Sequence, residues 1–141
     1  MDPIAVSVRA GALLLLIVVT GACTPGAAPP ATASATERGA QLFSGSCSAC
    51  HQSNGHGIPN VYPSLAGSPV VLGDAVVLAR WVINAERPAA MPPGRYTSLM
   101  PQFGWLKDAD AAALLTYLRE NFGNHAPAVD GAAVAAARGR P

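Results

Sequence analysis

The stretch Cys47-Ser48-Ala49-Cys50-His51 decides what the rest of this chain is built around. Two cysteines separated by two residues and followed at once by histidine form the attachment sequence of c-type haem. Each thiol adds to one vinyl group of the porphyrin, and the imidazole that follows can bind the iron as its proximal ligand. We therefore predict one covalently attached haem c, with Cys47 and Cys50 as attachment residues and His51 as an iron ligand.

Two other uses of a Cys-x-x-Cys pair compete with this interpretation. A redox-active pair normally lies in a βαβ context, and the sequence shows no β-strand pattern of any length. A structural zinc site needs four ligands, usually with a second Cys/His pair at regular spacing. The spare candidates Cys23, His56 and His125 form no such pair. We expect His56 to lie too near His51 in sequence to reach the opposite face of a haem, and His125 to lie at the surface.

The second axial ligand is predicted from the methionines. Apart from the initiator, the sequence contains Met91 and Met100. Met100 begins the segment 100–105, Met-Pro-Gln-Phe-Gly-Trp, in which a proline stiffens the loop and Phe103 can lie against the ring edge. We predict Met100 as the sixth ligand, and Met91 and a purely gap-filling methionine remain open as alternatives. A thioether opposite a histidine raises the potential of haem iron, and two filled axial positions suit electron transfer.

Four further residues are candidates for the surroundings of the haem. A ligating imidazole usually donates its other N–H to a fixed acceptor. The carbonyl of Pro63 is the first candidate for that acceptor and the carbonyl of Pro59 is the second. Arg95 and Tyr96 are candidates for contacts with the propionates, although solvated loop residues are the simpler interpretation.

The N-terminal part of the chain has the pattern of an export signal. Arg9 precedes an apolar run over residues 10–19 that is too short for a comfortable membrane span and has the length of a signal core. Small residues then lead to Cys23, an order similar to a bacterial lipoprotein cleavage site. We expect a signal over residues 1–22, periplasmic location, and tethering to the membrane through acylated Cys23 or an uncleaved anchor, with ordinary cleavage left open. Residues 23–35, rich in proline and alanine, are expected to form a flexible tether.

The folded domain is expected over residues 36–123, with a partly disordered tail over 124–141. Apolar periodicity predicts helices over residues 36–46 and 75–84 and a third helix that begins at residue 108. A further short alanine-rich helix is possible in the tail, over residues 131–138. Proline and glycine predict loops over 52–68 and 85–107. The fold class is therefore all-α.

Local signals mark where these helices begin and end. Thr36, Asp74 and Asp108 are the predicted N-caps, and Gly123 stands where a C-terminal cap belongs. Gly39 inside the first helix costs stability relative to alanine, which favours a close crossing of two helices at that point.

Charge gives little indication of a charged partner. The chain carries 9 Lys and Arg against 8 Asp and Glu, a net charge of +1. No basic patch favours nucleic acid as a partner, and no strong field favours long-range steering. No acid/base pair, nucleophile or phosphate loop indicates catalysis by side chains, so the chain is not expected to be an enzyme.

Several segments together resemble the class I cytochromes c. The segments are Gly39 with Phe43, the Cys-x-x-Cys-His motif, the turn Tyr-Pro-Ser-Leu-Ala-Gly at 62–67, Met-Pro-x-Phe at 100–103, and Tyr117-Leu118 in the last helix. The resemblance covers about residues 36–123. It implies a cytochrome c-like fold of small helices and loops around one haem, with the first and last helices crossing at Gly39 near Tyr117. It also implies His51 and Met100 as axial ligands.

A narrower likeness indicates a physiological role. Residues 100–105 and 115–124 are similar to the cytochrome c domains that partner periplasmic alcohol, sugar-acid and aldehyde dehydrogenases. Those proteins often carry several haems, whereas this sequence has one motif. We expect an electron carrier between a periplasmic dehydrogenase or respiratory complex and an acceptor such as a terminal oxidase. The alternatives are a haem enzyme or gas sensor with an open or displaceable sixth ligand, and a metal-binding or interaction lipoprotein without haem.

Overall fold

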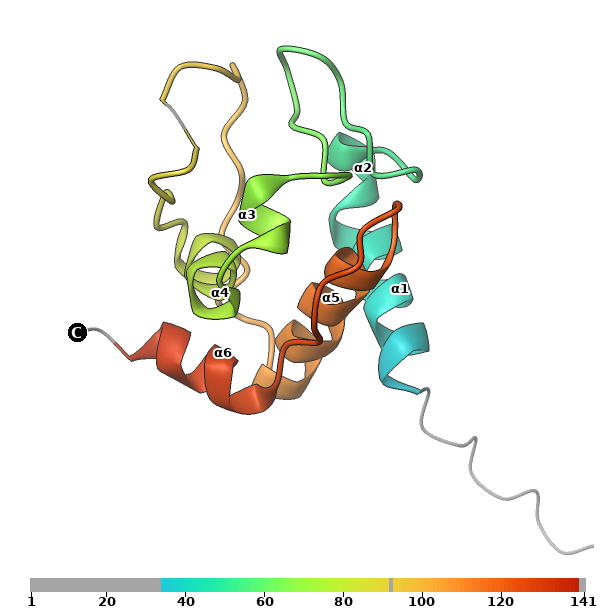
Figure 1. Ribbon diagram of the computed structural model, residues 1–141, viewed down its shortest axis with the longest axis vertical. Helices are drawn as coiled ribbons and strands as arrows, with labels where there is room; N and C mark the ends of the chain where they lie inside the picture. Colours follow the sequence, from blue (N-terminus) through green and yellow to red (C-terminus); the bar gives the residue numbers. More distant parts are fainter. Residues whose placement is uncertain (1–33, 92, 140–141) are drawn as a thin grey trace, which may run out of the picture. The chain divides into compact units, whose positions relative to one another are not determined.

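The structure, a computed structural model, describes residues 34–91 and 93–139. The expected signal over 1–22, Cys23 and tether residues 24–33 lie outside the described residues. The described part contains six helices and one isolated antiparallel bridge, between Ile58 and Tyr62. The helices are α1 (Ala35–Ser46), α2 (Ser48–His51), α3 (Pro69–Leu72), α4 (Ala75–Asn84), α5 (Asp108–Glu120) and α6 (Gly131–Arg138) (Figure 1). The all-α prediction is confirmed. Of the helices described, none has the length and apolar character that crossing a membrane requires.

Helices α1 and α5 pack side by side and cross at Gly39 (Figure 1). A Cβ atom on Gly39 would collide with the carbonyl oxygen of Ala113 and would lie 2.7 Å from the Cβ of Tyr117. The prediction of a close crossing near Tyr117 is therefore confirmed. The absent side chain lets the two helix backbones approach one another, which explains why glycine occupies a helix interior despite its cost.

Aromatic rings extend the same interface toward the C-terminal end of α1. The ring centroid of Phe43 lies 5.6 Å from that of Tyr117 and 4.9 Å from that of Phe122. Tyr117 and Phe122 meet edge-on at 5.7 Å, and such tilted arrangements are the favoured ones for aromatic pairs. Leucines of α4 and α5 complete the core, the deepest being Leu78, Leu114 and Leu115.

The helix starts differ from two of the predicted caps. Helix α1 is capped by Ser34, which forms a capping box with Glu37, so the folded part begins before Thr36 and includes two residues assigned to the tether. Helix α5 is preceded by Lys107, and Asp108 is its first residue. The Asp108 carboxylate pairs with Arg138 instead of capping its own helix. The third prediction is confirmed, because the Asp74 side chain accepts from the Val77 N–H at 2.9 Å.

Two more local predictions need correction. Helix α5 ends at Glu120, and its last turn is closed by Asn121, whose backbone N–H and side-chain amide both donate to the Tyr117 carbonyl. Gly123 follows with φ 78° in the turn beyond and does not cap the helix directly. Helix α3 was not anticipated; Pro69 at its first position favours this single turn.

The possible short helix of the tail is present as α6, with the bounds 131–138, and the described residues 124–139 pack against the domain. Val129, Val134 and Ala137 are buried, and α6 packs against α4 and α5. Asp130 caps α6 by accepting from the Ala133 N–H at 2.8 Å. Thr116 and Val129 exchange two hydrogen bonds, of 3.2 and 2.9 Å. Burial of apolar side chains against α4 and α5, which alanine-rich composition does not reveal, orders this segment.

The crossing predicts opposite effects for two glycine substitutions in α1. Gly39→Ala should lower the free energy of unfolding by about 2 kcal/mol or more, since the new methyl group meets backbone that has no room to move. Gly45→Ala is the matched control, because nothing lies within 4 Å of a Cβ there, and it should raise stability by up to about 1 kcal/mol. Urea unfolding followed by circular dichroism measures both. Equal effects of the two substitutions would contradict the close crossing.

Candidate functional site

The Cys-x-x-Cys-His motif forms a single helical turn at the end of α1. The backbone N–H of Cys47 donates to the Phe43 carbonyl at 2.9 Å, and the N–H of His51 donates to the Cys47 carbonyl at 2.9 Å. Cys47 therefore closes α1 and opens α2. This turn places Cys47, Cys50 and His51 on the wall of one cavity.

The cavity has a volume of about 190 Å³ and lies between the motif and the loop over residues 85–107. Its lining contains both cysteines, His51, both methionines and mostly apolar neighbours: Ser46, Cys47, Cys50, His51, Tyr62, Pro63, Trp81, Ala85, Arg87, Met91, Tyr96, Ser98, Leu99, Met100, Pro101 and Phe103. Leu99 is 89% exposed, so the cavity opens to the surface. In Figure 1, α2 and the loop 85–107 lie on opposite sides of the upper part of the domain.

The ring of His51 is buried and fixed in orientation. Its Nδ1 lies 2.9 Å from the carbonyl oxygen of Pro63. Because a carbonyl only accepts, Nδ1 carries the proton and Nε2 keeps the lone pair that can bind a metal. Burial lowers the pKa of the imidazole, and the bond to Pro63 partly opposes this shift. The first candidate acceptor is therefore confirmed, while Pro59 is exposed.

The loop that supplies Pro63 is held at several points. The N–H of Gly57 donates to the His51 carbonyl at 2.8 Å, and the N–H of Leu65 donates to the Gly55 carbonyl at 2.7 Å. Asn124, only 1% exposed, donates to the carbonyls of Leu65 and Leu118 and accepts from the N–H of Gly67. These contacts fix the acceptor of His51 against the end of α5. The sequence analysis gave Asn124 no role, because only its burial reveals one.

The two cysteine thiols are unpaired and lie in different surroundings. Burial, reinforced by the neighbouring Cys50, raises the pKa of the Cys47 thiol to about 11. A thiol with this pKa is protonated at neutral pH, whereas a redox-active cysteine works as a thiolate with a lowered pKa. The surroundings of Cys47 therefore argue against the redox-active interpretation of the motif.

Both methionines line the cavity and both are half-buried. Met100 belongs to a segment anchored on α4, because the N–H of Phe103 donates to the Val82 carbonyl at 3.0 Å and Phe103 itself is buried. The Phe103 ring lines the same cavity. The structure thus brings the predicted ligand Met100, its alternative Met91 and the predicted aromatic neighbour to one wall.

The other candidates divide into cavity residues and surface residues. Tyr96 lines the cavity, whereas Arg95 is exposed with its guanidinium over the Tyr96 ring at 5.7 Å. Arg87 lines the cavity and lies over the Trp81 ring at 5.6 Å. The sequence analysis missed Arg87, because it lies in a loop three residues after the end of α4, where no periodic pattern indicates the direction of a side chain. His125 is exposed, as expected, and His56 is exposed and does not line the cavity.

These residues suit the chemistry of haem c. Two thiols lie one turn apart, an imidazole presents Nε2, and a methionine sulfur is available on the facing loop. Apolar side chains such as Phe103 and Leu99 suit the faces of a porphyrin, and a cation at Arg87 suits a carboxylate. The lining residues therefore fit a covalently bound haem.

The comparisons with known proteins agree with this chemistry. The family model for "Cytochrome c" matches residues 36–121. The chain is 32% identical over 93 residues to the "Alcohol dehydrogenase (quinone), cytochrome c subunit" of Gluconobacter oxydans (strain 621H), covering 63% of this chain and 19% of that protein. It is 29% identical over 91 residues to "Cytochrome c-552" of Thermus thermophilus, covering 61% and 69%. It is 30% identical over 96 residues to the "Gluconate 2-dehydrogenase cytochrome c subunit" of Pantoea cypripedii, covering 66% and 22%. The chain spans about a fifth of the length of the dehydrogenase subunits.

The geometry of the Pro63 loop predicts unequal effects of two further substitutions. Gly57 and Gly67 both have a left-handed backbone, with φ 63° and 65°, so alanine at either should cost about 1–2 kcal/mol of stability. A Cβ at Gly57 would also collide with the carbonyls of Tyr62 and Pro63, whereas nothing lies within 4 Å at Gly67. Gly57→Ala should therefore cost at least about 1 kcal/mol more than Gly67→Ala and shift the ¹⁵N resonance of His51 Nδ1. Equal costs and an unmoved resonance would contradict the fixed acceptor.

Proposed function

The chain belongs to the cytochrome c family, and we propose that it is a single-haem carrier that moves one electron at a time in the periplasm. Its donor is a dehydrogenase or respiratory complex, and its acceptor is a downstream protein such as a terminal oxidase. Membership of the family implies covalently bound haem c and electron transfer, and makes the chain an electron carrier or electron-transfer subunit. The haem supplies an iron that changes between the ferric and ferrous states.

One observation carries the proposal: a single cavity gathers the attachment residues Cys47 and Cys50 with His51 and Met100. We assign Nε2 of His51 and the sulfur of Met100 as the two axial ligands. The Pro63 carbonyl keeps the imidazole in the tautomer and orientation that ligation needs. Buried Phe103 and half-buried Trp81 keep water from the ligands. The soft thioether raises the potential, which suits a carrier that hands electrons to a strong oxidant.

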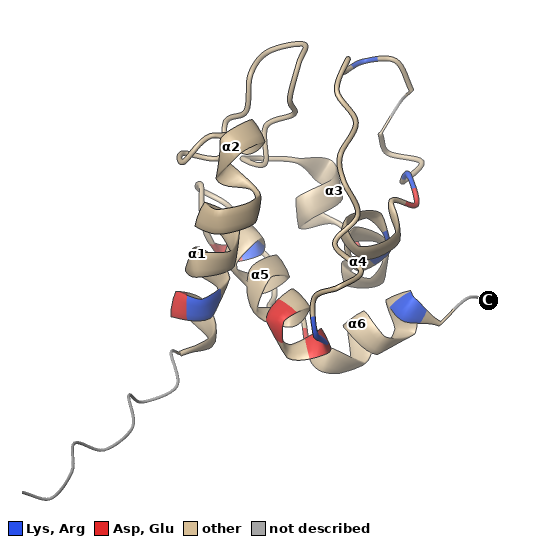
Figure 2. Cartoon of the chain, turned by 180° about the vertical axis from the view of Figure 1, so that it is seen from behind, with Lys and Arg blue, Asp and Glu red and all other residues tan. Residues whose placement is uncertain are grey.

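The surroundings of the cavity support docking by apolar contact. Residues 52–73 contain no Lys, Arg, Asp or Glu, and residues 88–106 contain Arg95 alone. Figure 2 shows no charged residue in the loop 52–68, whereas charged residues lie along α1 and α5, at the end of α6 and in the loop 85–107, which contains Glu86, Arg87, Arg95 and Lys107. A partner that reaches the cavity mouth therefore meets mostly uncharged backbone and side chains, so association should depend weakly on salt.

A dehydrogenase partner is supported by the relatives named as cytochrome c subunits of alcohol and gluconate dehydrogenases. The matched region is about a fifth of those subunits and 69% of the Thermus cytochrome c-552. This coverage is compatible with a free carrier that serves a dehydrogenase. A dedicated subunit of a larger complex is the second form of the proposal.

The proposal includes a domain layout taken from the sequence pattern. Residues 1–22 act as an export signal, the tether follows from Cys23 and ends before Ser34, and the haem domain begins at Ser34 and includes the C-terminal helix α6. Acylated Cys23 or the N-terminal segment holds the domain at the membrane surface. Such a tether keeps the carrier near membrane partners and raises its effective concentration there.

Covalent attachment gives the first test. The exported protein should keep its haem after denaturation and migrate as a haem-staining band. Cys47→Ala and Cys50→Ala should each leave haem held by one thioether, with a shifted alkaline pyridine spectrum, and the double variant should lose covalent haem. Matched preparations of Ser46→Ala, a lining residue without a thiol, should resemble the wild type. A colourless wild-type protein would end the carrier proposal.

Carbon monoxide tests the sixth ligand. The reduced wild-type holoprotein should keep its low-spin visible spectrum when CO is added, because both axial positions are filled. Met100→Ala should bind CO at least about tenfold more tightly and show a lower midpoint potential, since the thioether is gone. Met91→Ala is the matched control and should behave as the wild type. Prompt CO binding by the wild type would instead favour a haem enzyme or gas sensor, and reversed roles of the two variants would assign Met91 as the ligand.

A further inference from the structure

Helix α6 lies outside residues 36–121, the part matched by the family model, yet it is an integral part of the domain. Val134 is fully buried and Ala137 is 1% exposed. These two side chains seat α6 on α4 and α5. The backbone of Arg138, the last residue of the helix, is therefore held in a fixed position relative to α4 and α5.

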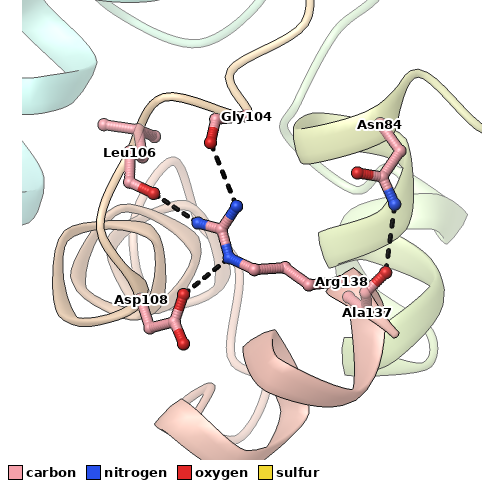
Figure 3. Close-up of polar contacts among 6 residues, drawn as sticks. All are labelled: Asn84, Gly104, Leu106, Asp108, Ala137 and Arg138. Carbon is pink, nitrogen blue, oxygen red and sulfur yellow. Dashed lines mark hydrogen bonds and ion pairs between the residues drawn. The ribbon is translucent and has the colours of Figure 1, made fainter. Parts of the chain in front are cut away.

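The Arg138 guanidinium binds the segment that connects Met100 to α5 (Figure 3). Its Nε donates to the Asp108 carboxylate at 2.6 Å, and its Nη1 donates to the Gly104 carbonyl at 3.0 Å. Its Nη2 donates to the Leu106 carbonyl. All three acceptors follow Met100 by four to eight residues. One rigid group thus holds two carbonyls of the loop that carries the assigned ligand, together with the first residue of α5.

The end of α6 is tied to the same loop by a second route. The side-chain amide of Asn84, at the end of α4, donates to the Ala137 carbonyl at 3.0 Å (Figure 3). The Asn84 carbonyl accepts from the side-chain amide of Gln102 at 3.1 Å. Gln102 stands two residues after Met100. The end of α4, the end of α6 and residues 100–107, which we call the methionine loop, are therefore linked on both sides of Gly104.

These contacts bear on the shape of the loop more than on global stability. The Arg138 and Asp108 side chains are 31% and 48% exposed, and an ion pair this exposed contributes little to folding. The guanidinium, however, is planar and offers its donors in a fixed fork, so it specifies where the two carbonyls must lie. Residues 104 and 106 lie outside helices, and their carbonyls take Arg138 as the donor.

We propose that Arg138 is a positioning residue for Met100: by holding residues 104–108 against α6, it keeps the methionine side chain turned into the cavity. The inference rests on the proposed assignment of Met100 as the sixth ligand. When Arg138 is absent, the loop gains conformations in which the sulfur has left its position. External ligands then compete for that position more successfully, and the midpoint potential falls with the occupancy of the sulfur.

The test measures imidazole binding to the oxidised holoprotein together with the midpoint potential. Arg138→Ala should bind imidazole about tenfold more tightly than the wild type, which corresponds to about 1.4 kcal/mol, and should have a lower potential. Arg38→Ala is the matched control. Arg38 forms a comparable pair with Asp110, at 2.7 and 3.0 Å, but joins α1 to α5 and touches no part of the methionine loop. Its imidazole affinity should stay within about twofold of the wild type, well short of a tenfold effect.

Hydrogen exchange supplies a second readout that does not depend on ligand binding. In Arg138→Ala the Phe103 and Leu106 amides should exchange faster, whereas the amide of Cys47 at the end of α1 should be unchanged. If Arg138→Ala does not fold, Arg138→Gln, which keeps a polar but shorter side chain and loses the guanidinium fork, takes its place with the same expectations.

The possible results distinguish a failure of the role of Arg138 from a failure of the assignment of Met100 as the sixth ligand. Tighter imidazole binding by Met100→Ala together with wild-type binding and exchange in Arg138→Ala would overturn the role of Arg138 alone. Unchanged imidazole binding in Met100→Ala would overturn the ligand assignment, and the role of Arg138 with it. Equal effects of Arg138→Ala and Arg38→Ala would reduce Arg138 to a general contributor to stability, which also overturns the inference.

Discussion

The close contact between α1 and α5 is the constraint on which the rest of the structure depends. Because Gly39 lets the two backbones touch, the position of α1 along and around α5 is fixed. The motif follows directly from the last turn of α1, through the hydrogen bond from Cys47 to Phe43. The methionine loop leads directly into the first turn of α5. The same crossing therefore sets the separation of the two segments that line the cavity, although neither segment touches Gly39.

Much of the described domain between the helices is irregular backbone, and this creates a second requirement. A buried carbonyl without a donor costs about 1–3 kcal/mol, and loops have few donors of their own. Side chains from the C-terminal half meet this need. Asn124 serves the backbone of residues 65, 67 and 118, and buried Arg119 donates to the carbonyls of Val71, Gly73 and Pro127. Each of these residues fixes the shape of distant loops, Arg119 from within α5 and Asn124 from the segment after it.

Sequence analysis succeeded where a short pattern carries its own chemistry. The haem motif, the need for glycine at position 39 and the Pro63 carbonyl as a partner of His51 all follow from residue type and spacing, and the structure contains the crossing and the hydrogen bond. It failed where tertiary contacts decide. Aspartate is a residue type that commonly caps helices, but the carboxylate of Asp108 pairs with Arg138, which is distant in the sequence. The eight-residue helix α6, which the alanine-rich pattern indicated only as possible, is too short to be stable alone. The burial of Val134 that orders it is not visible in any local sequence pattern.

On the proposed ligation, the two axial ligands are held by unequal means. His51 ends the helical turn that follows α1, directly after the attachment residues Cys47 and Cys50, and its ring is fixed again by Pro63. Met100 stands in a loop whose shape depends on hydrogen bonds from Phe103, Gln102 and Arg138. Local opening has the lowest free energy where few contacts are lost, so the methionine side opens before the histidine side. Changes elsewhere in the domain, including those that a docked partner imposes, therefore reach the iron mainly through the methionine loop.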